Sequence, residues 1–288
     1  MKDFAMTSLR IIPKILARDF LLILFLGSCV APPKHDTQKI KPGERIIECK
    51  GFSIAYRSDL FPSAKCTALP RETQNKESGP PFDVGPARVK FEFKVKRPLP
   101  ALNKGARYFF PAFAEVWVTP LHDWSVISFG KSYFWLAGQE KLLKELLVKR
   151  PADFDKWRNK DHYFLPDEPF NNAAQQIDAK IRFLDVPWGS GVRFLTYYAN
   201  GITGYGVTND ELCYNFQGIT RNGQYYISSR IAVRHSSLPD SIDSPEARSN
   251  GEPEEKQAEE RKLNRFADKT FSPSLEALDR MMESISFR

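Results

Sequence analysis

The sequence has few of the residues that carry metal and nucleophile chemistry. Its 288 residues include four cysteines and four histidines. No two histidines stand at the spacing of metal ligands, and no CxxC pair occurs. We therefore expect that the protein holds no metal and no cofactor.

Motifs for phosphate binding and for serine catalysis are also missing. The glycine-rich stretch at residues 201–206 is not followed by the Lys-Ser/Thr pair of a phosphate-binding loop. Gly189-Ser190-Gly191 lacks the spacer residues of a serine-nucleophile elbow. Because this serine lies between two expected strands, we interpret residues 188–191 as a turn.

Basic residues are not concentrated in any one stripe of the chain. The formal net charge is +7, and the basic residues are dispersed. Nucleic-acid binding usually shows a clustered basic stripe, so we expect no nucleic-acid partner. A mild positive charge favours contact with anionic lipid head groups or with cell-envelope polymers.

The apolar run at residues 20–26 is too short to cross a bilayer as a stable helix. A basic region precedes it, and small residues lead from it to Cys29, as in a secretory signal peptide. Leu26-Gly27-Ser28-Cys29 resembles the bacterial lipobox, which implies cleavage after residue 28 and lipid on Cys29. The alternative is an uncleaved N-terminal anchor in which the cysteine is incidental.

Lipidation of Cys29 would place the protein in the cell envelope, because several acyl chains anchor a protein stably. Val30, rather than aspartate, follows the cysteine. In a cell with two membranes this favours the periplasmic side of the outer membrane. Residues 29–44 are polar and contain three prolines, which is typical of a flexible tether.

The remaining pattern predicts an α+β domain at residues 45–235, with an antiparallel sheet flanked by helices. Apolar residues at helical spacing predict a helix over 133–149. Residues 57–86 and 151–172 are expected to be loops. Alternating or short apolar runs predict strands at 46–49, 52–56, 89–95, 114–118, 179–183, 192–199, 212–216 and 225–233.

The chain changes character after the last expected strand. Residues 236–260 are rich in proline and glutamate and are interpreted as a solvated acidic linker. Apolar residues within 254–286 predict C-terminal helices, which Pro273 divides in two.

Several phrases between residues 51 and 240 resemble a group of bacterial exported proteins. They include the run at 79–86, Asn172-Ala173-Ala174-Gln175 and the run at 189–196. No activity is established for that group, so the resemblance implies no catalytic residue. The arrangement is also similar to the oxygen-evolving subunits of photosystem II and to Mog1-like proteins, a likeness of fold that implies no function.

Lipidation of Cys29 would leave three cysteines. Proximity in the sequence favours a disulfide between Cys49 and Cys66. Cys213 would then be a free thiol, and we favour a buried thiol over a nucleophile. His122 and Asp123 are interpreted as part of a turn, since adjacent side chains usually point apart.

Aromatic residues of the late strands are the best candidates for a binding surface. Tyrosine and tryptophan combine a flat apolar face with a polar tip, and a platform of them would suit a glycan or a small organic ligand. The alternative is that they form the sheet core. The candidates are Trp188, Tyr197, Tyr198, Tyr205 and Tyr226.

These observations leave three hypotheses for function. The first is a membrane-tethered, non-enzymatic module that binds an envelope protein or glycan. The second is a hydrolase-type enzyme that uses Cys213 or the pair His122 and Asp123, in which case these side chains should converge in one pocket. The third is an assembly factor whose helices at 254–286 dock onto a partner.

Overall fold

The computed structural model describes part of the chain, within a unit that spans residues 40–288. The expected signal peptide and Cys29 lie outside the described residues. The described residues are 42–71, 85–96, 114–124, 133–154, 156–157, 165–168, 173–199, 206–247 and 253–288.

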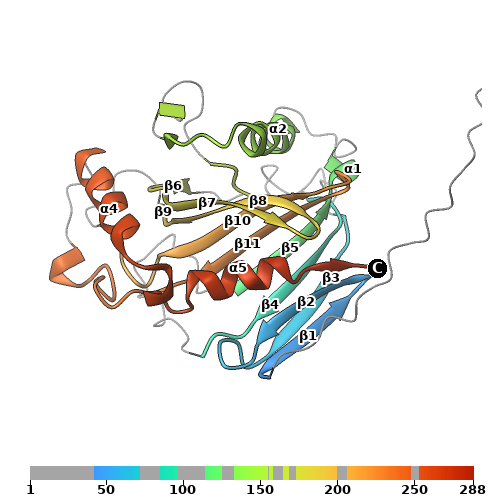
Figure 1. Cartoon of the computed structure of the whole chain (residues 1–288), viewed down its shortest axis with the longest axis horizontal. Coiled ribbons are helices and arrows are strands. Elements are labelled where there is room, and N and C mark those ends of the chain that lie inside the picture. Colours follow the sequence, from blue (N-terminus) through green and yellow to red (C-terminus); the bar gives the residue numbers. More distant parts are fainter. Residues whose placement is uncertain are drawn as a thin grey trace, which may run out of the picture. The chain divides into compact units, whose positions relative to one another are not determined.

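The main element of the fold is an antiparallel sheet with the strand order β3-β4-β5-β11-β10-β8-β7 (Figure 1). Together with the helices it makes the protein α+β, as the sequence predicts. Hairpin turns join β7 to β8 and β10 to β11. The strands are β3 (Ala64–Leu69), β4 (Arg88–Phe93), β5 (Ala114–Pro120), β7 (Ala179–Val186), β8 (Gly189–Thr196), β10 (Cys213–Thr220) and β11 (Tyr225–Ala232).

Two small sheets accompany the main one. β1 (Glu44–Cys49) and β2 (Phe52–Arg57) form a hairpin, and β12 (Ser286–Phe287) pairs with β2. The C-terminal strand therefore lies beside one of the earliest strands of the domain (Figure 1). β6 (Ala174–Gln175) pairs with β9 (Tyr198–Ala199).

The helices come from the middle and the end of the chain. Ser274 caps the last of them by accepting a hydrogen bond from the backbone N–H of Ala277. No described helix has the length and apolar character needed to span a membrane. The helices are α1 (Leu121–Trp124), α2 (Tyr133–Lys149), η2 (Pro245–Ala247), α4 (Pro253–Arg265), η3 (Asp268–Thr270) and α5 (Leu275–Glu283).

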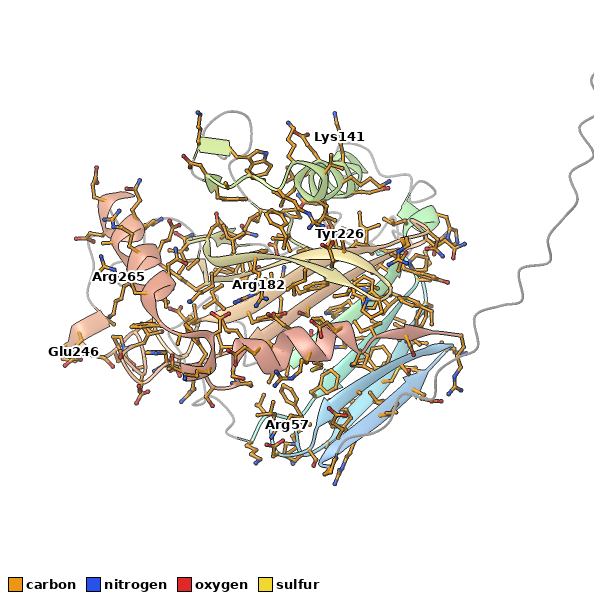
Figure 2. The ribbon with its side chains drawn as sticks, viewed as in Figure 1. Arg57, Lys141, Arg182, Tyr226, Glu246 and Arg265 are labelled. Atoms are coloured by element: carbon orange, nitrogen blue, oxygen red, sulfur yellow. A yellow bond between two sulfur atoms is a disulfide. The ribbon has the colours of Figure 1, made fainter. Side chains whose placement is uncertain are left out.

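Both faces of the central strands are covered. On one face, Leu143 and Leu146 of α2 share a hydrophobic core with Tyr226 of β11. The side chain of Tyr226 points from the sheet toward α2 (Figure 2). On the other face, Leu278 and Met282 of α5 join the larger core. Because water reaches neither face, β10 and β11 are buried along almost their whole length.

The structure corrects three expectations from the sequence. β3 lies within the stretch predicted to be a loop, because pairing with β4 and not local propensity fixes it. The turn between β7 and β8 is formed by Pro187 and Trp188, so the expected turn at 188–191 is right for Trp188 only, and residues 189–191 begin β8. The described residues of the expected acidic linker are not all solvated, since Leu238, Ala247 and Glu260 are buried.

The packing of the C-terminal helices bears on the third hypothesis. Leu263, Leu275 and Leu278 are fully buried, as is Met282. An assembly factor would need an apolar helix face left open for a partner. The apolar residues of these helices pack into the protein's own core. The hypothesis of an assembly factor therefore loses its main support.

Candidate functional site

The tyrosines proposed as a binding platform are in the interior. Tyr197, Tyr198 and Tyr226 are buried, while Tyr205 lies outside the described residues. The prediction of an exposed tyrosine surface is therefore wrong for these three. In a sheet with one open face, every second side chain of a strand would face solvent. Here both faces of the sheet are covered, so the side chains on both faces are buried.

Tyr198 belongs to a buried polar network on the α2 face. Its hydroxyl donates to Oδ1 of Asp167 at 2.8 Å and accepts from Nδ2 of Asn215 at 2.9 Å. Nη2 of Arg230 donates to the same Asp167 oxygen at 2.5 Å. Burial is the main cause that raises the pKa of Tyr198 well above its ordinary value. The network therefore keeps a neutral phenol beside a buried ion pair, an arrangement that stabilises a fold.

Cys213 adjoins this network. Its sulfur donates to the carbonyl oxygen of Thr196 at 3.3 Å, and Nδ2 of Asn215 lies 3.6 Å from it. Burial raises the pKa of this thiol to about 12. A thiol with that pKa is protonated at neutral pH, whereas nucleophilic catalysis needs the thiolate. The structure favours the inert free thiol over the catalytic one.

His122 and Asp123 do contact each other, against the expectation that adjacent side chains point apart. Nε2 of His122 lies 3.2 Å from Oδ1 of Asp123, which also accepts from Nη2 of Arg71 at 2.6 Å. The pair adjoins the Thr220 end of β10, and Cys213 begins that strand. β10 is 8 residues long, which separates its ends by on the order of 20 Å. The two sets of candidate catalytic residues therefore do not share a pocket.

Two hairpin turns and the last residues of β12 and beyond line an open pocket of about 540 Å³, which we name the hairpin pocket. One turn is Lys50-Gly51, where both residues have positive φ, 50° and 85°. This is the geometry of a two-residue turn that glycine favours at its second position. The other turn contains Arg221 and joins β10 to β11.

Aromatic rings from four separate segments line the hairpin pocket. Phe52 meets Tyr225 edge-on with the ring centroids 5.1 Å apart, and Phe287 stacks on Tyr225 at 5.7 Å. Trp188 contacts Phe287 at 6.2 Å and donates its Nε1–H to the carbonyl oxygen of Met282 at 2.8 Å. The indole is thereby fixed, and half-buried rings of the other three residues lie at the pocket.

Cationic side chains complete the hairpin pocket. Lys50 and Arg221 come from the two turns, and Arg288 follows β12. Nη2 of Arg288 donates to Oε1 of Glu48 at 2.5 Å, so its charge is partly compensated. A pocket with flat apolar faces and positive charges suits a ligand that is anionic and has apolar faces of its own.

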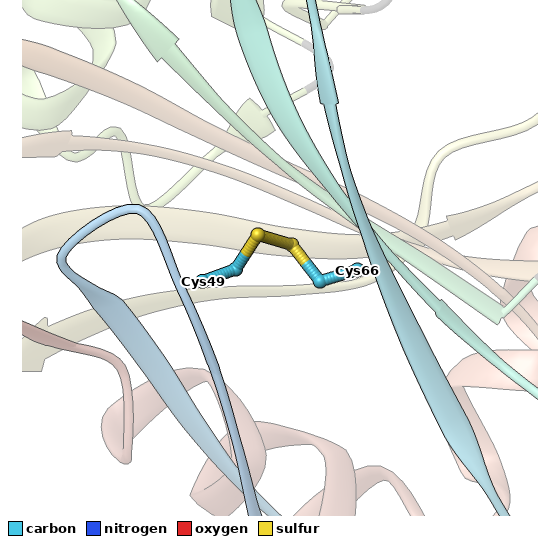
Figure 3. The surroundings of a disulfide bond; sticks show 2 residues. All are labelled: Cys49 and Cys66. Carbon is cyan, nitrogen blue, oxygen red and sulfur yellow. A yellow bond between two sulfur atoms is a disulfide. The ribbon is translucent and has the colours of Figure 1, made fainter.

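A disulfide between Cys49 and Cys66 adjoins the Lys50-Gly51 turn of the hairpin pocket (Figure 3). Cys49 is the last residue of β1 and directly precedes Lys50, while Cys66 lies in β3. Their Cα atoms are 6.2 Å apart. The bond therefore links the β1–β2 turn to the edge strand of the main sheet.

Sequence reasoning found Trp188 but missed its partners. Phe52 and Phe287 are more than two hundred residues apart in the chain and meet only because β12 pairs with β2. Register places Phe287 directly opposite Phe52. No local pattern in the sequence carries that information.

The described residues define an α+β protein with an aromatic, cationic pocket. Among them, no group of three histidine, cysteine, aspartate or glutamate side chains is placed to hold a metal ion. Comparison with protein-family models, with curated proteins and with solved structures gives no match in any of the three. The resemblances drawn from the sequence therefore stay predictions.

Proposed function

We propose that the protein is a lipid-anchored binding module of the bacterial cell envelope, attached through Cys29. The support is the order of features in the sequence: a basic region, a short apolar run, small residues and then the cysteine. The polar residues that follow give the domain a tether. In a two-membrane cell, Val30 in place of aspartate after Cys29 favours the periplasmic side of the outer membrane.

The ligand class that fits the hairpin pocket best is an anionic glycan. Sugar rings present flat C–H faces that pack on Tyr225 and Phe287, and their carboxylates or phosphates meet Lys50 and Arg221. The single observation that carries this proposal is the meeting of aromatic rings and cations around one cavity of about 540 Å³. The mild positive charge of the whole chain favours the same class of ligand.

The enzymatic alternative has less support. Its candidate thiol, Cys213, has a strongly raised pKa, and it lies at the opposite end of β10 from His122 and Asp123. Acid–base partners must reach hydrogen-bond range of the same reacting group. We therefore favour binding over hydrolysis.

The proposal predicts that the full-length protein in detergent binds a four-residue oligogalacturonate, used as a model anionic glycan. Arg221→Gln should weaken binding about tenfold, because one charge-assisted hydrogen bond is lost. Tyr225→Ala should also weaken it, through the loss of a stacking face. Isothermal titration calorimetry measures both effects.

The methyl ester of the same oligosaccharide is the matched ligand control, because it keeps the rings and loses the charges. Lys141→Gln is the matched protein control: Lys141 is exposed on α2 (Figure 2) and does not line the hairpin pocket. Equal affinity for the acid and the ester, or an Arg221→Gln variant that binds like the parent, would overturn the glycan assignment.

A further inference from the structure

Cationic side chains gather at one end of the β1–β2 and β3–β4 hairpins, and we name this group the basic end. The strand pairing brings them together, because β1 begins opposite the last residue of β2, and β3 begins opposite the last residue of β4. Arg57 of β2 is labelled in Figure 2. The residues of the basic end are Arg45, Arg57, Lys65, Lys94 and Lys96.

The loop at residues 58–63, between β2 and β3, joins the two hairpins at the basic end. Nη1 of Arg45 donates to the backbone carbonyl oxygen of Pro62 at 3.1 Å. The backbone N–H of Lys94 donates to the carbonyl oxygen of Ser63 at 2.8 Å. One short loop therefore contacts the start of β1 and the end of β4, so their cations belong to one surface.

Positive charge exceeds negative charge at this surface. Two of its cations have carboxylate partners, since Arg57 pairs with Asp59 and Lys65 with Glu92. Even with Glu44 counted, the cations outnumber the carboxylates. Within the part of the chain that the structure describes, no carboxylate is in ion-pair range of the other three cations, which are all exposed: Arg45, Lys94 and Lys96. Exposed cations of this kind attract a partner that carries negative charge.

The expected tether joins the domain at the same end. β1 starts at Glu44, where the tether expected at residues 29–44 finishes. Lys39 and Lys41 of the tether sequence add two further positive charges. A polar tether of this length spans on the order of 20 Å. Lipid on Cys29 would therefore hold the basic end within reach of the bilayer surface.

The hairpin pocket lies at the other end of the same strands. The Lys50-Gly51 turn joins β1 to β2, and each strand has 6 residues. A strand of that length separates the pocket from the basic end by on the order of 20 Å. The pocket also carries cations, Lys50 and Arg221, so charge alone does not distinguish the two ends. The entry of the tether does distinguish them.

We propose that the basic end docks on the anionic head groups of the membrane that holds the lipid anchor, so that the hairpin pocket points away from the bilayer. Anionic lipids attract basic segments beside a membrane anchor, and the attraction acts within a Debye length of the surface, about 10 Å at moderate salt. The tether keeps the domain close to that range. This docking rests on the proposed anchor at Cys29, and it would leave the pocket open to glycans of the envelope.

Energy transfer from a dye on the protein to an acceptor dye on the lipid head groups tests the docking. Full-length lipidated protein with Cys213→Ser carries one dye, either through Ser63→Cys in the loop of the basic end or through Gln224→Cys at the hairpin pocket. Both positions are exposed. The proteins are reconstituted in vesicles of equimolar phosphatidylcholine and phosphatidylglycerol, and in vesicles of phosphatidylcholine alone.

On the anionic vesicles, the dye at position 63 should transfer more efficiently than the dye at position 224, because it is nearer the surface by about 20 Å. On the neutral vesicles this difference should shrink. In about 1 M salt, where the Debye length falls to about 3 Å, the anionic vesicles should give the same small difference as the neutral ones. A difference that is absent on anionic vesicles, or equal on both kinds, overturns the docking.

Two pairs of substitutions locate the docking surface. Lys94→Gln with Lys96→Gln removes two exposed charges and breaks no ion pair, so the variant is expected to fold. It should lower the ratio of docked to undocked protein at least about tenfold. Lys50→Gln with Arg221→Gln removes the same charge at the hairpin pocket and should leave docking unchanged. If only this second pair abolishes the transfer difference, the pocket faces the lipid and the proposed orientation is wrong.

Flotation of the same vesicles separates failure of the docking from failure of the anchor. Protein that floats with neither kind of vesicle has no working anchor, and both proposals then fail. Protein that floats with both kinds but shows no lipid-dependent difference in transfer is anchored without docking. That result overturns the docking and leaves the anchor in place.

Discussion

Replacing Asp167 by alanine should lower the free energy of unfolding by about 3 to 5 kcal/mol, which is the usual effect of removing one partner of a buried ion pair. Asp167 is buried and accepts from Nη2 of Arg230 at 2.5 Å and from the hydroxyl of Tyr198 at 2.8 Å. Without its carboxylate, the Arg230 guanidinium loses the counter-charge that most offsets its burial. Urea denaturation of parent and variant measures the change in the free energy of unfolding.

Three further variants distinguish the effect of losing the buried charge from the effect of losing one hydrogen bond and from the effect of an exposed substitution. Tyr198→Phe removes one hydroxyl and should cost only about 1 kcal/mol. Glu145→Ala breaks an exposed helical pair with Lys149 and should cost less than about 0.5 kcal/mol. Replacing Asp167 by leucine and Arg230 by methionine together should recover part of the loss. A loss below about 1 kcal/mol for Asp167→Ala would contradict the view of this network as a structural element.

The second large effect concerns the disulfide. Changing both Cys49 and Cys66 to serine should lower the free energy of unfolding by about 3 kcal/mol, given that the bond closes a loop of 17 residues. Binding of the oligogalacturonate should weaken as well, because Cys49 directly precedes the Lys50-Gly51 turn of the hairpin pocket. Denaturation and calorimetry on the same preparations give both values.

Cys213→Ser is the matched control for this double variant. It also removes a thiol, but Cys213 is free in the structure, so its loss should leave the oligogalacturonate affinity unchanged. If the double variant bound the oligosaccharide as tightly as the parent does, the disulfide would not position the pocket. Reduction of the parent protein should reproduce the double variant, since both lack the same bond.

Secondary structure was predictable where the local pattern was strong. The helix over 133–149 coincides with α2, and the charged strand at 89–95 overlaps β4, whose Val89, Phe91 and Phe93 are buried. β3 was missed because its alternating residues are small and Pro- and Ser-rich sequence surrounds it. Its position depends on pairing with β4, which local sequence does not contain.

The candidate sites were less predictable because they depend on tertiary pairing. The acidic run before residue 260 has the composition of a solvated segment, yet Oε1 of Glu259 and of Glu260 accept backbone N–H groups of Val207 and Asp178. Tyr214 and Tyr226 read as members of alternating strands, but both faces of those strands are covered. The basic end gathers cations from two hairpins, and sequence spacing does not show the pairing that brings them together.

Mass spectrometry of tryptic peptides from membrane-extracted protein tests the anchor on which the proposed function depends. The peptide at residues 29–34 should begin at Cys29 and carry a diacylglycerol and an N-linked acyl chain. An unmodified peptide spanning residues 19–34, which crosses the expected cleavage point, would contradict the account.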